Sequence, residues 1–157
     1  MGRRRTRPTS PCPLPAPGGT GAVKAARRAL EKAGLAGDQI AHVNAHATST
    51  PEGDRAELQA IRTIFGEKAG AVTVTANKSM IGHTLGAAGA IEAIITVQTI
   101  RESCVPPTIN LDQPDDDAAG LDIVTGQARS QDVEIALSNS FGFGGQNTAL
   151  IFRRWVE

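Results

Sequence analysis

The sequence predicts an α/β fold, in which strands and helices alternate and pack as layers. Short runs rich in β-branched residues recur along the chain, and longer segments with helical spacing of their apolar residues separate them. The chain has 157 residues, the size of one ordinary domain. Hydrophobic residues make up 40% of it, which is enough for a core. Frequent Gly and the absence of Tyr indicate an interior of small and aliphatic side chains with close backbone approach.

Three segments have helical character. Residues 20–34 carry one apolar face and end at Gly34, a residue typical of the position just past a helix. Residues 51–65 begin with Pro51, which suits a first helical turn. Residues 86–101 are apolar nearly all round, so this helix should be buried on several sides. Because a domain of this size has few layers, such a helix indicates that the chain is part of something larger.

Five segments have strand character, and most of them alternate with the helices. The last two flank a Gly-rich turn and are expected to pair as a hairpin with a long tip. The predicted strands are residues 39–45, 71–75, 121–124, 134–137 and 148–152.

Residues 1–19 differ from the rest of the chain in being rich in Arg and Pro. They contain no apolar stretch of the kind found in secretory signals, so we predict a disordered tail. An Arg-rich anchor for acidic partners is the alternative. Residues 20–157 are predicted to form one domain.

Composition excludes several classes of protein. A formal net charge of zero and 3% aromatic residues argue against a nucleic-acid surface. The longest apolar run, residues 87–100, is broken by Glu92 and Gln98 and predicts no membrane span. Cys12 and Cys104 stand in unrelated contexts, which predicts neither disulfides nor a metal site and favours a cytoplasmic location.

The first polar motif is HATSTPEGD, residues 46–54. His46 directly follows a predicted strand, where active-site groups commonly lie in α/β folds. A single His at a strand end is more often structural, and the hydroxyl residues up to Thr50 are suited to capping the helix that Pro51 begins. The motif alone leaves both interpretations open.

The second motif is ANKSMIGHTLGAAGAIE, residues 76–92. Lys78 follows a predicted strand, and His83 precedes the apolar helix. Glu92 lies within that helix and needs a partner if it is buried. Lys78 and Glu92 are therefore a plausible ion pair, with a solvated loop lysine as the alternative.

The third motif is NSFGFGGQN, residues 139–147. Its glycines free the backbone and can turn N–H groups toward an anion or an oxyanion. The spacing fits neither a dinucleotide-binding loop nor a phosphate-binding P-loop. A plain hairpin tip is the alternative.

Four stretches in this order carry a specific family resemblance: VNAHATSTPEGD, NKSMIGHTLGAAGAIE, VPPTINLDQPD and NSFGFGGQNTALIF. Together they resemble the C-terminal half of a β-ketoacyl-acyl carrier protein synthase, a condensing enzyme of type II fatty acid synthesis. Modular polyketide ketosynthases are similar but usually differ after the first His. The resemblance implies a thiolase-like layered αβαβα fold built from two similar halves, of which this chain has the C-terminal one. It also implies that the helix after His83 lies in the middle of the layers.

The resemblance further implies a decarboxylating Claisen condensation. Malonyl-carrier protein loses carbon dioxide, and the resulting carbanion attacks an acyl thioester on a Cys. His46 and His83 correspond to the family's paired active-site histidines, which stabilise the enolate, and Lys78 corresponds to its active-site lysine. Residues that correspond to the pantetheine-binding and gating groups are Thr48, Thr50, Phe143, Gly142, Gly144 and Gly145. Acidic residues that correspond to those ordering the site are Asp54, Glu57 and Glu92.

The chain departs from the family in one decisive way. The family's nucleophilic Cys belongs to the N-terminal half, in a Thr-Ala-Cys-Ser-like turn, and no such turn occurs here. Cys104 is predicted at a helix end, where the dipole disfavours a thiolate. Ala47 stands where many relatives have Gly, a small change.

The expected partners follow from the same resemblance. They are an acyl carrier protein bearing acyl and malonyl thioesters, and either a second copy of the chain or a complementing N-terminal half. No cofactor is expected, since phosphopantetheine arrives on the carrier protein. Two alternatives stay open: a malonyl-carrier protein decarboxylase, and a non-catalytic partner or remnant of a complete synthase.

Overall fold

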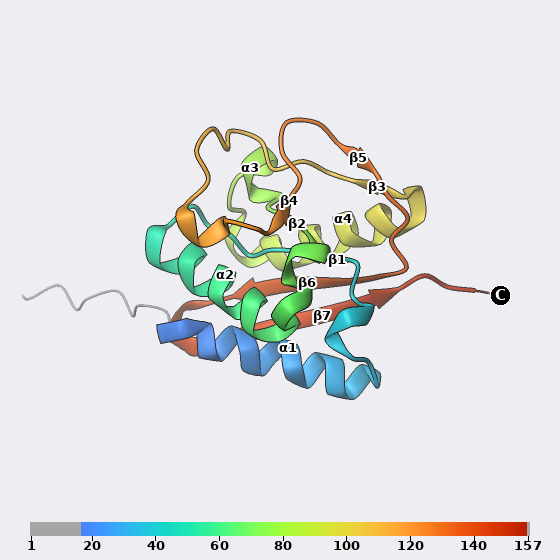
Figure 1. Cartoon of the computed structure of the whole chain (residues 1–157), viewed down its shortest axis with the longest axis horizontal. Coiled ribbons are helices and arrows are strands. Elements are labelled where there is room, and N and C mark those ends of the chain that lie inside the picture. The colour runs from blue at the N-terminus through green and yellow to red at the C-terminus, as the bar shows by residue number, and fades with distance from the viewer. Residues whose placement is uncertain (1–16, 157) are drawn as a thin grey trace, which may run out of the picture.

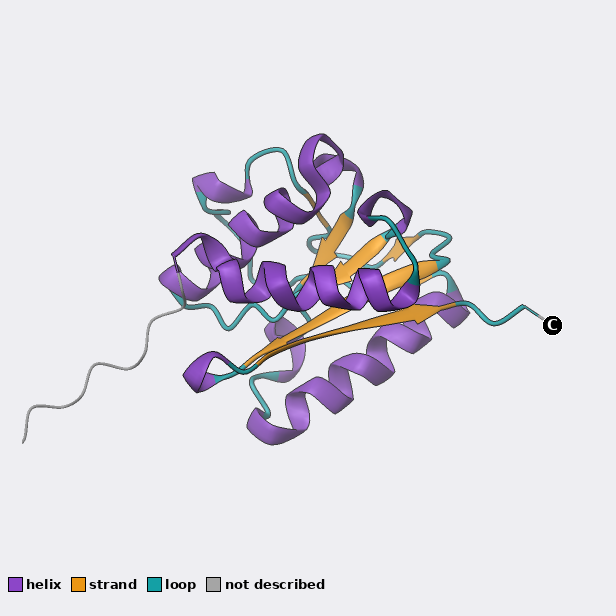
Figure 2. Ribbon diagram, turned by 90° about the horizontal axis from the view of Figure 1, so that it is seen from below, coloured by secondary structure: helices purple, strands orange, loops and turns teal. Residues whose placement is uncertain are grey.

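The computed structural model describes residues 17–156, which form a mixed sheet with helices on both faces (Figures 1 and 2). The strand order is β4-β2-β1-β6-β7. The first four strands in this order are parallel neighbours, and β7 runs antiparallel to β6 as the expected hairpin. The strands are β1 (His42–Asn44), β2 (Thr73–Thr75), β4 (Asp122–Ile123), β6 (Ile135–Phe141) and β7 (Asn147–Arg153).

All five predicted strands are present in the structure, but their lengths differ from the predicted ones. Strand β6 continues through the polar residues Ser138–Ser140 to Phe141, because these residues pair with β7 along its whole length. The tip of the hairpin is therefore shorter than predicted. Strands β1 and β2 are shorter than predicted, since 3-10 turns (Gly37–Gln39 and Gly66–Ala71) occupy the residues before them. A separate pair of short strands, β3 (Cys104–Val105) and β5 (Arg129–Ser130), was not predicted.

Helices α1 (Thr20–Ala33) and α2 (Pro51–Phe65) cover one face of the sheet. Both lie where the apolar periodicity predicts them, and Gly34 ends α1 in the left-handed conformation with φ 65°. The main core lies between these helices and the sheet. Its centre is formed by Leu30, Ile61 and Phe65 from the helix side and by Val43, Val74 and Leu137 from the strands.

Helix α4 (Ala88–Glu102) covers the opposite face, after the short helix α3 (Lys78–Ile81) that the sequence did not predict. Its sheet side is buried, but Ile94 and Val97 on its outer side are 62% and 37% exposed. The sequence predicts that this helix is buried on several sides, but residues 17–156 bury it on one side only. An apolar helix covered on one side only has the character of an interface.

The contact between α4 and the sheet is polar around Glu92 and Thr96, whereas Ile100, near the C-terminal end of α4, packs in an apolar cluster with Ala136 and Phe152 of the sheet. On β1, His42 and Asn44 point to this side, and the His42 Nε2 lies 2.8 Å from the Thr75 Oγ1. The Asn44 amide donates to the Glu92 carbonyl and to the Thr96 hydroxyl, each at 3.0 Å. These bonds fix the position of α4 against the end of β1, where His46 follows.

Only the last three residues of the predicted N-terminal tail, residues 1–19, lie in the described part of the chain. Residues 1–16 of the predicted tail lie outside the described residues, and Pro17–Gly19 form a 3-10 turn that leads into α1. Gly19 packs so closely on α2 that a Cβ there would lie 2.1 Å from the Ala56 carbonyl oxygen. In the part of the chain from 17 to 156, no helix is long and apolar enough to cross a membrane.

Candidate active site

A cleft of about 710 Å³ opens where the parallel strands β1 and β6 end. This is the edge at which α/β folds usually place their active sites. Its walls come from the start of α1, the segment between β1 and α2, the segment before α4 and the β6–β7 turn. The site residues predicted from the sequence that line it are His46, Thr48, Thr50, Glu57, His83, Gly142, Gly144 and Gly145.

Glu57 holds the backbone that carries His46. Its carboxylate accepts the His46 N–H at 2.9 Å, the Ala47 N–H at 2.8 Å and the Asn139 side-chain amide at 3.0 Å. Burial raises the pKa of Glu57, and these three donors oppose that rise by favouring the charged form. The helix after the motif thus reaches back to fix the orientation of the loop before it.

Replacing Glu57 with Gln is expected to lower the free energy of unfolding by about 2 kcal/mol, because the new NH₂ group would face an N–H donor. Denaturant unfolding measures this effect. Glu52→Gln is the matched control, since Glu52 is exposed on the same helix. Equal stability of both variants would contradict the role given to Glu57.

Asp54, one turn before Glu57, lies beneath the same loop. Burial raises the pKa of Asp54, and the backbone N–H groups of Thr50, Ser49 and Thr48 oppose the rise. The Thr50 residue occupies the N-cap position of α2, but its side chain makes no cap hydrogen bond. Its hydroxyl instead lies 3.1 Å from that of Thr48, so the capping interpretation is wrong for this side chain.

Ala47 adopts a backbone conformation that favours glycine, with φ 28°. A non-glycine residue in this region carries strain on the order of 1 kcal/mol. Ala47→Gly is therefore expected to raise the free energy of unfolding by up to about 1 kcal/mol. Ala45→Gly, on a neighbouring buried residue, should have the opposite effect. Thermal unfolding of both variants tests this expectation, which fails if Ala47→Gly destabilises as much as Ala45→Gly.

Lys78 and Glu92 form the ion pair suggested by the sequence, and the solvated lysine is ruled out. Their side chains are 5% and 0% exposed, and the Lys78 ammonium donates to the Glu92 carboxylate. Burial raises the pKa of Glu92, and the bond from Lys78 opposes the rise. The pair lies behind His46 rather than on the cleft wall, with the Lys78 Nζ 3.5 Å from the His46 Nδ1.

The two imidazoles face the cleft at right angles, with ring centroids 5.8 Å apart. Burial, followed by the charges of Lys78 and His83, lowers the pKa of His46 to about 4, so the ring is neutral near pH 7. A lysine ammonium beside Nδ1 assigns the ring proton to Nε2. For His83, the Leu85 N–H donates to Nδ1 at 3.1 Å, which again assigns a proton to Nε2.

The Gly-rich turn closes one end of the cleft. The Gly142 N–H donates to the Gln146 carbonyl at 2.8 Å, and Gly144 and Gly145 have φ of 78° and 80°. The Phe143 side chain lies outside the described part of the chain, so its role as a gate stays a prediction. Phe141 was missed by sequence reasoning, and its ring lies 5.3 Å from that of His46.

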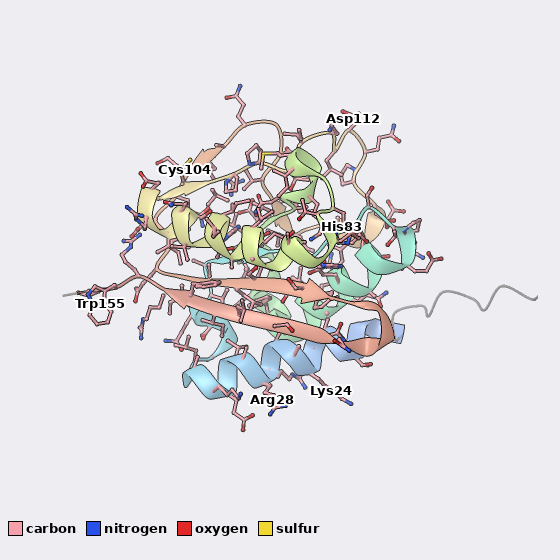
Figure 3. All side chains as sticks on the ribbon, turned by 180° about the vertical axis from the view of Figure 1, so that it is seen from behind. Lys24, Arg28, His83, Cys104, Asp112 and Trp155 are labelled. Carbon is pink, nitrogen blue, oxygen red and sulfur yellow. The ribbon has the colours of Figure 1, made fainter. Side chains whose placement is uncertain are left out.

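Cys104 lies far from the cleft, at the opposite end of α4 from His83 (Figure 3). It is an exposed free thiol. Cys12 lies outside the described residues. Between residues 17 and 156, no group of His, Cys, Asp and Glu is arranged to hold a metal ion.

The fold and the site together describe a layered α/β domain with two histidines on one cleft and a buried Lys–Glu pair behind them. Residues 9–112 match the family model described as the C-terminal domain of β-ketoacyl synthase. The chain belongs to the β-ketoacyl synthase family, and its fold is the C-terminal half of the thiolase-like fold.

Relatives in sequence agree with this assignment. The chain is 51% identical over 143 residues to the 3-oxoacyl-[acyl-carrier-protein] synthase 2 of Vibrio cholerae and 48% identical over 141 residues to that of Synechocystis. These alignments cover 89% and 90% of this chain but 34% of each relative. The chain thus spans about a third of the length of the relatives it matches.

Solved structures agree in the same way. A β-ketoacyl synthase from Burkholderia phymatum superposes with a TM-score of 0.83 at 42% identity, over 95% of this chain and 35% of that one. A type II polyketide ketosynthase in complex with its acyl-carrier protein superposes with a TM-score of 0.84 at 35% identity, over 89% and 34%.

Proposed function

We propose that the chain supplies the decarboxylating side of a β-ketoacyl-acyl carrier protein synthase. The observation that supports this most is the pair of imidazoles in one cleft, each with a donor group beside its Nδ1, an arrangement that leaves Nε2 to donate. Two N–H donors at one cleft are suited to a single oxygen that gains negative charge. The substrate proposed is a malonyl thioester on the phosphopantetheine arm of an acyl carrier protein.

In the proposed reaction, the bond between the malonyl methylene and its carboxylate breaks. The electron pair moves into the thioester, whose carbonyl oxygen becomes an enolate, and carbon dioxide leaves. The Nε2–H groups of His46 and His83 stabilise this enolate. Since both rings are donors in their neutral form, neither needs to gain or lose a proton during this step.

The groups behind His46 position it. Lys78 holds the Nδ1 side of the ring, Glu92 holds Lys78, and Glu57 holds the backbone. Thr48 and Thr50 place two hydroxyls on the cleft wall, where they can bond the amides of a pantetheine arm. The thiolate that carries the acyl group is proposed to come from the part of the relatives that this chain does not span.

The test is to incubate the chain with malonyl-carrier protein and to measure carbon dioxide and acetyl-carrier protein. His46→Gln and His83→Gln are each expected to lower the rate about a hundredfold or more, by removing a donor to the enolate. Cys104→Ser should leave it unchanged. If both histidine variants decarboxylate the substrate as fast as the original chain does, the proposal is refuted.

A decarboxylase without condensation is the second candidate. The geometry that favours it is the same histidine pair, because enolate formation requires no nucleophilic thiol. Adding an acyl-carrier protein and a polypeptide that covers the unmatched two thirds of a relative separates the two candidates. β-Ketoacyl product formed only with that addition supports the synthase, while acetyl product in both cases supports the decarboxylase.

A further inference from the structure

The short segment that carries Lys78, residues 76–79, has little regular structure to hold it in place. Strand β2 ends at Thr75, and Lys78 begins α3, which has four residues. The Asn77 side chain makes no cap hydrogen bond and has no hydrogen-bond partner among the described residues. A single helical turn is not stable by itself. The position of this segment therefore depends on bonds to other parts of the chain.

Two hydroxyl groups make these bonds, one at each end of the segment. The Thr108 Oγ1 accepts the Ala76 N–H at 2.9 Å. The Ser79 Oγ accepts the Ile109 N–H at 3.0 Å and donates to the Ala76 carbonyl at 2.7 Å. Apart from the bonds of the Lys78 ammonium, no other hydrogen bond between described residues joins the segment to a distant part of the chain.

The chain around Thr108 is itself fixed to the sheet. The Thr108 N–H donates to the Val124 carbonyl at 2.7 Å, and Thr108 pairs with Thr125 in a parallel bridge just beyond β4. Thr108 is 8% exposed, so water has little access to replace its bond to the Ala76 N–H. The sheet thus provides a firm base, and the two hydroxyls attach the segment that carries Lys78 to this base.

The position of Lys78 matters because its ammonium makes two contacts at once. It donates to the Glu92 carboxylate on α4, and it lies 3.5 Å from the His46 Nδ1. The Lys78 side chain is 5% exposed, and close-packed surroundings leave it little freedom to compensate for a displaced backbone. Misplacement of a supporting group by about 1 Å can lower the rate of an enzyme on the order of a hundredfold.

We propose that the Thr108 and Ser79 hydroxyls are positioning groups that place the Lys78 ammonium against His46. They act through the backbone on either side of Lys78 and do not touch the substrate. The catalytic consequence rests on the proposed function, in which the Nε2–H of His46 stabilises the enolate. The contact between Lys78 and His46 does not depend on that function.

Titration of His46 by NMR tests this contact without any substrate. Burial lowers the pKa of His46 to about 4, and the charges of Lys78 and His83 lower it further in the same direction. Thr108→Val keeps the shape of the side chain but removes the acceptor, so Lys78 should move away and the pKa of His46 should rise toward 6.5. Ser79→Ala should act in the same direction. Thr108→Ser keeps the hydroxyl and should leave the pKa of His46 at about 4.

The rate of malonyl-carrier protein decarboxylation is the second measurement. Thr108→Val is expected to lower kcat about tenfold with less than about a twofold change in KM, while Thr108→Ser stays within about twofold of the original chain. Thr99→Val is the matched control, because Thr99 is 2% exposed and its hydroxyl donates to the Ile95 carbonyl of its own helix. It should change neither kcat nor the pKa of His46. Rates are compared at a temperature at which circular dichroism shows every variant to be folded.

Each other outcome has a definite meaning. The inference is overturned if the pKa of His46 stays at about 4 in Thr108→Val, whatever the rate, or if Thr108→Ser or Thr99→Val raises it equally. A raised pKa of His46 with an undiminished kcat would overturn it too. A raised pKa of His46 in Thr108→Val, when the original chain does not decarboxylate the substrate, would support the positioning role and refute the proposed function. Decarboxylation by the original chain with no change in the pKa of His46 in Thr108→Val would do the reverse.

Discussion

Replacing Lys78 with Met is expected to lower the free energy of unfolding by about 3–5 kcal/mol near neutral pH. The substitution keeps most of the side-chain volume and removes only the charge. Glu92, whose side chain is 0% exposed, would then hold a buried carboxylate with no cation beside it. The cost is large because desolvation of a charge is offset only by a close partner.

The pH dependence of this loss identifies its cause. Burial already raises the pKa of Glu92, and removal of Lys78 takes away the group that opposes the rise. A carboxyl whose folded pKa lies above its unfolded value favours the folded state at low pH and loses that contribution as pH rises. The deficit of Lys78→Met should therefore be smaller at about pH 5 than at about pH 8.

The double variant Lys78→Met with Glu92→Leu supplies the control. With both charges gone, we expect stability within about 1–2 kcal/mol of the original chain, since buried ion pairs are often replaceable by apolar residues. Chemical denaturation of the original chain, Lys78→Met, Glu92→Leu and the double variant measures the coupling energy between the two side chains. A double variant as unstable as Lys78→Met would mean that Lys78 stabilises the fold through packing, and the electrostatic explanation would be wrong.

The sequence predicts the fold well where local periodicity decides it. Helix α2 has the predicted bounds because Pro51 and the apolar stripe specify them locally. Strand β6 was predicted too short because Ser138 and Asn139 are paired by β7 and buried only in the folded sheet. Helix α3 has four residues, too few for any periodic signal.

For the site, the sequence indicates the residue types but not their arrangement. The Lys78–Glu92 pair could be anticipated, since one follows a strand and the other interrupts an apolar helix. Asn139 and Phe141 could not be assigned as neighbours of Glu57 and His46, because these contacts join strand β6 to segments far away in the chain. His42 carried no motif at all, and its role depends on which side of β1 meets α4.

His42 provides the second large expectation, an acid-dependent loss of stability. The residue is 0% exposed, and burial lowers its pKa to about 4 from the ordinary value of 6.5. A base with a depressed folded pKa binds fewer protons when folded than when unfolded. Its contribution is complete above the unfolded pKa and is lost as pH falls toward the folded pKa. Between about pH 7 and pH 4.5, His42 should account for a decrease of about 2–3 kcal/mol in the free energy of unfolding.

Other groups titrate in the same range, so the decisive quantity is a difference between variants. His46 acts in the same direction as His42, and the buried carboxyls with raised pKa values act in the opposite one. In the variant His42→Leu with Thr75→Val, both members of the buried hydrogen bond become apolar, so neither is left without a partner. The decrease between about pH 7 and pH 4.5 should be smaller than in the original chain by about 2–3 kcal/mol. If the double variant shows the same pH dependence as the original chain, other groups cause the loss of stability. The folded state would then accept a proton on His42 without disturbing the contact between β1 and α4.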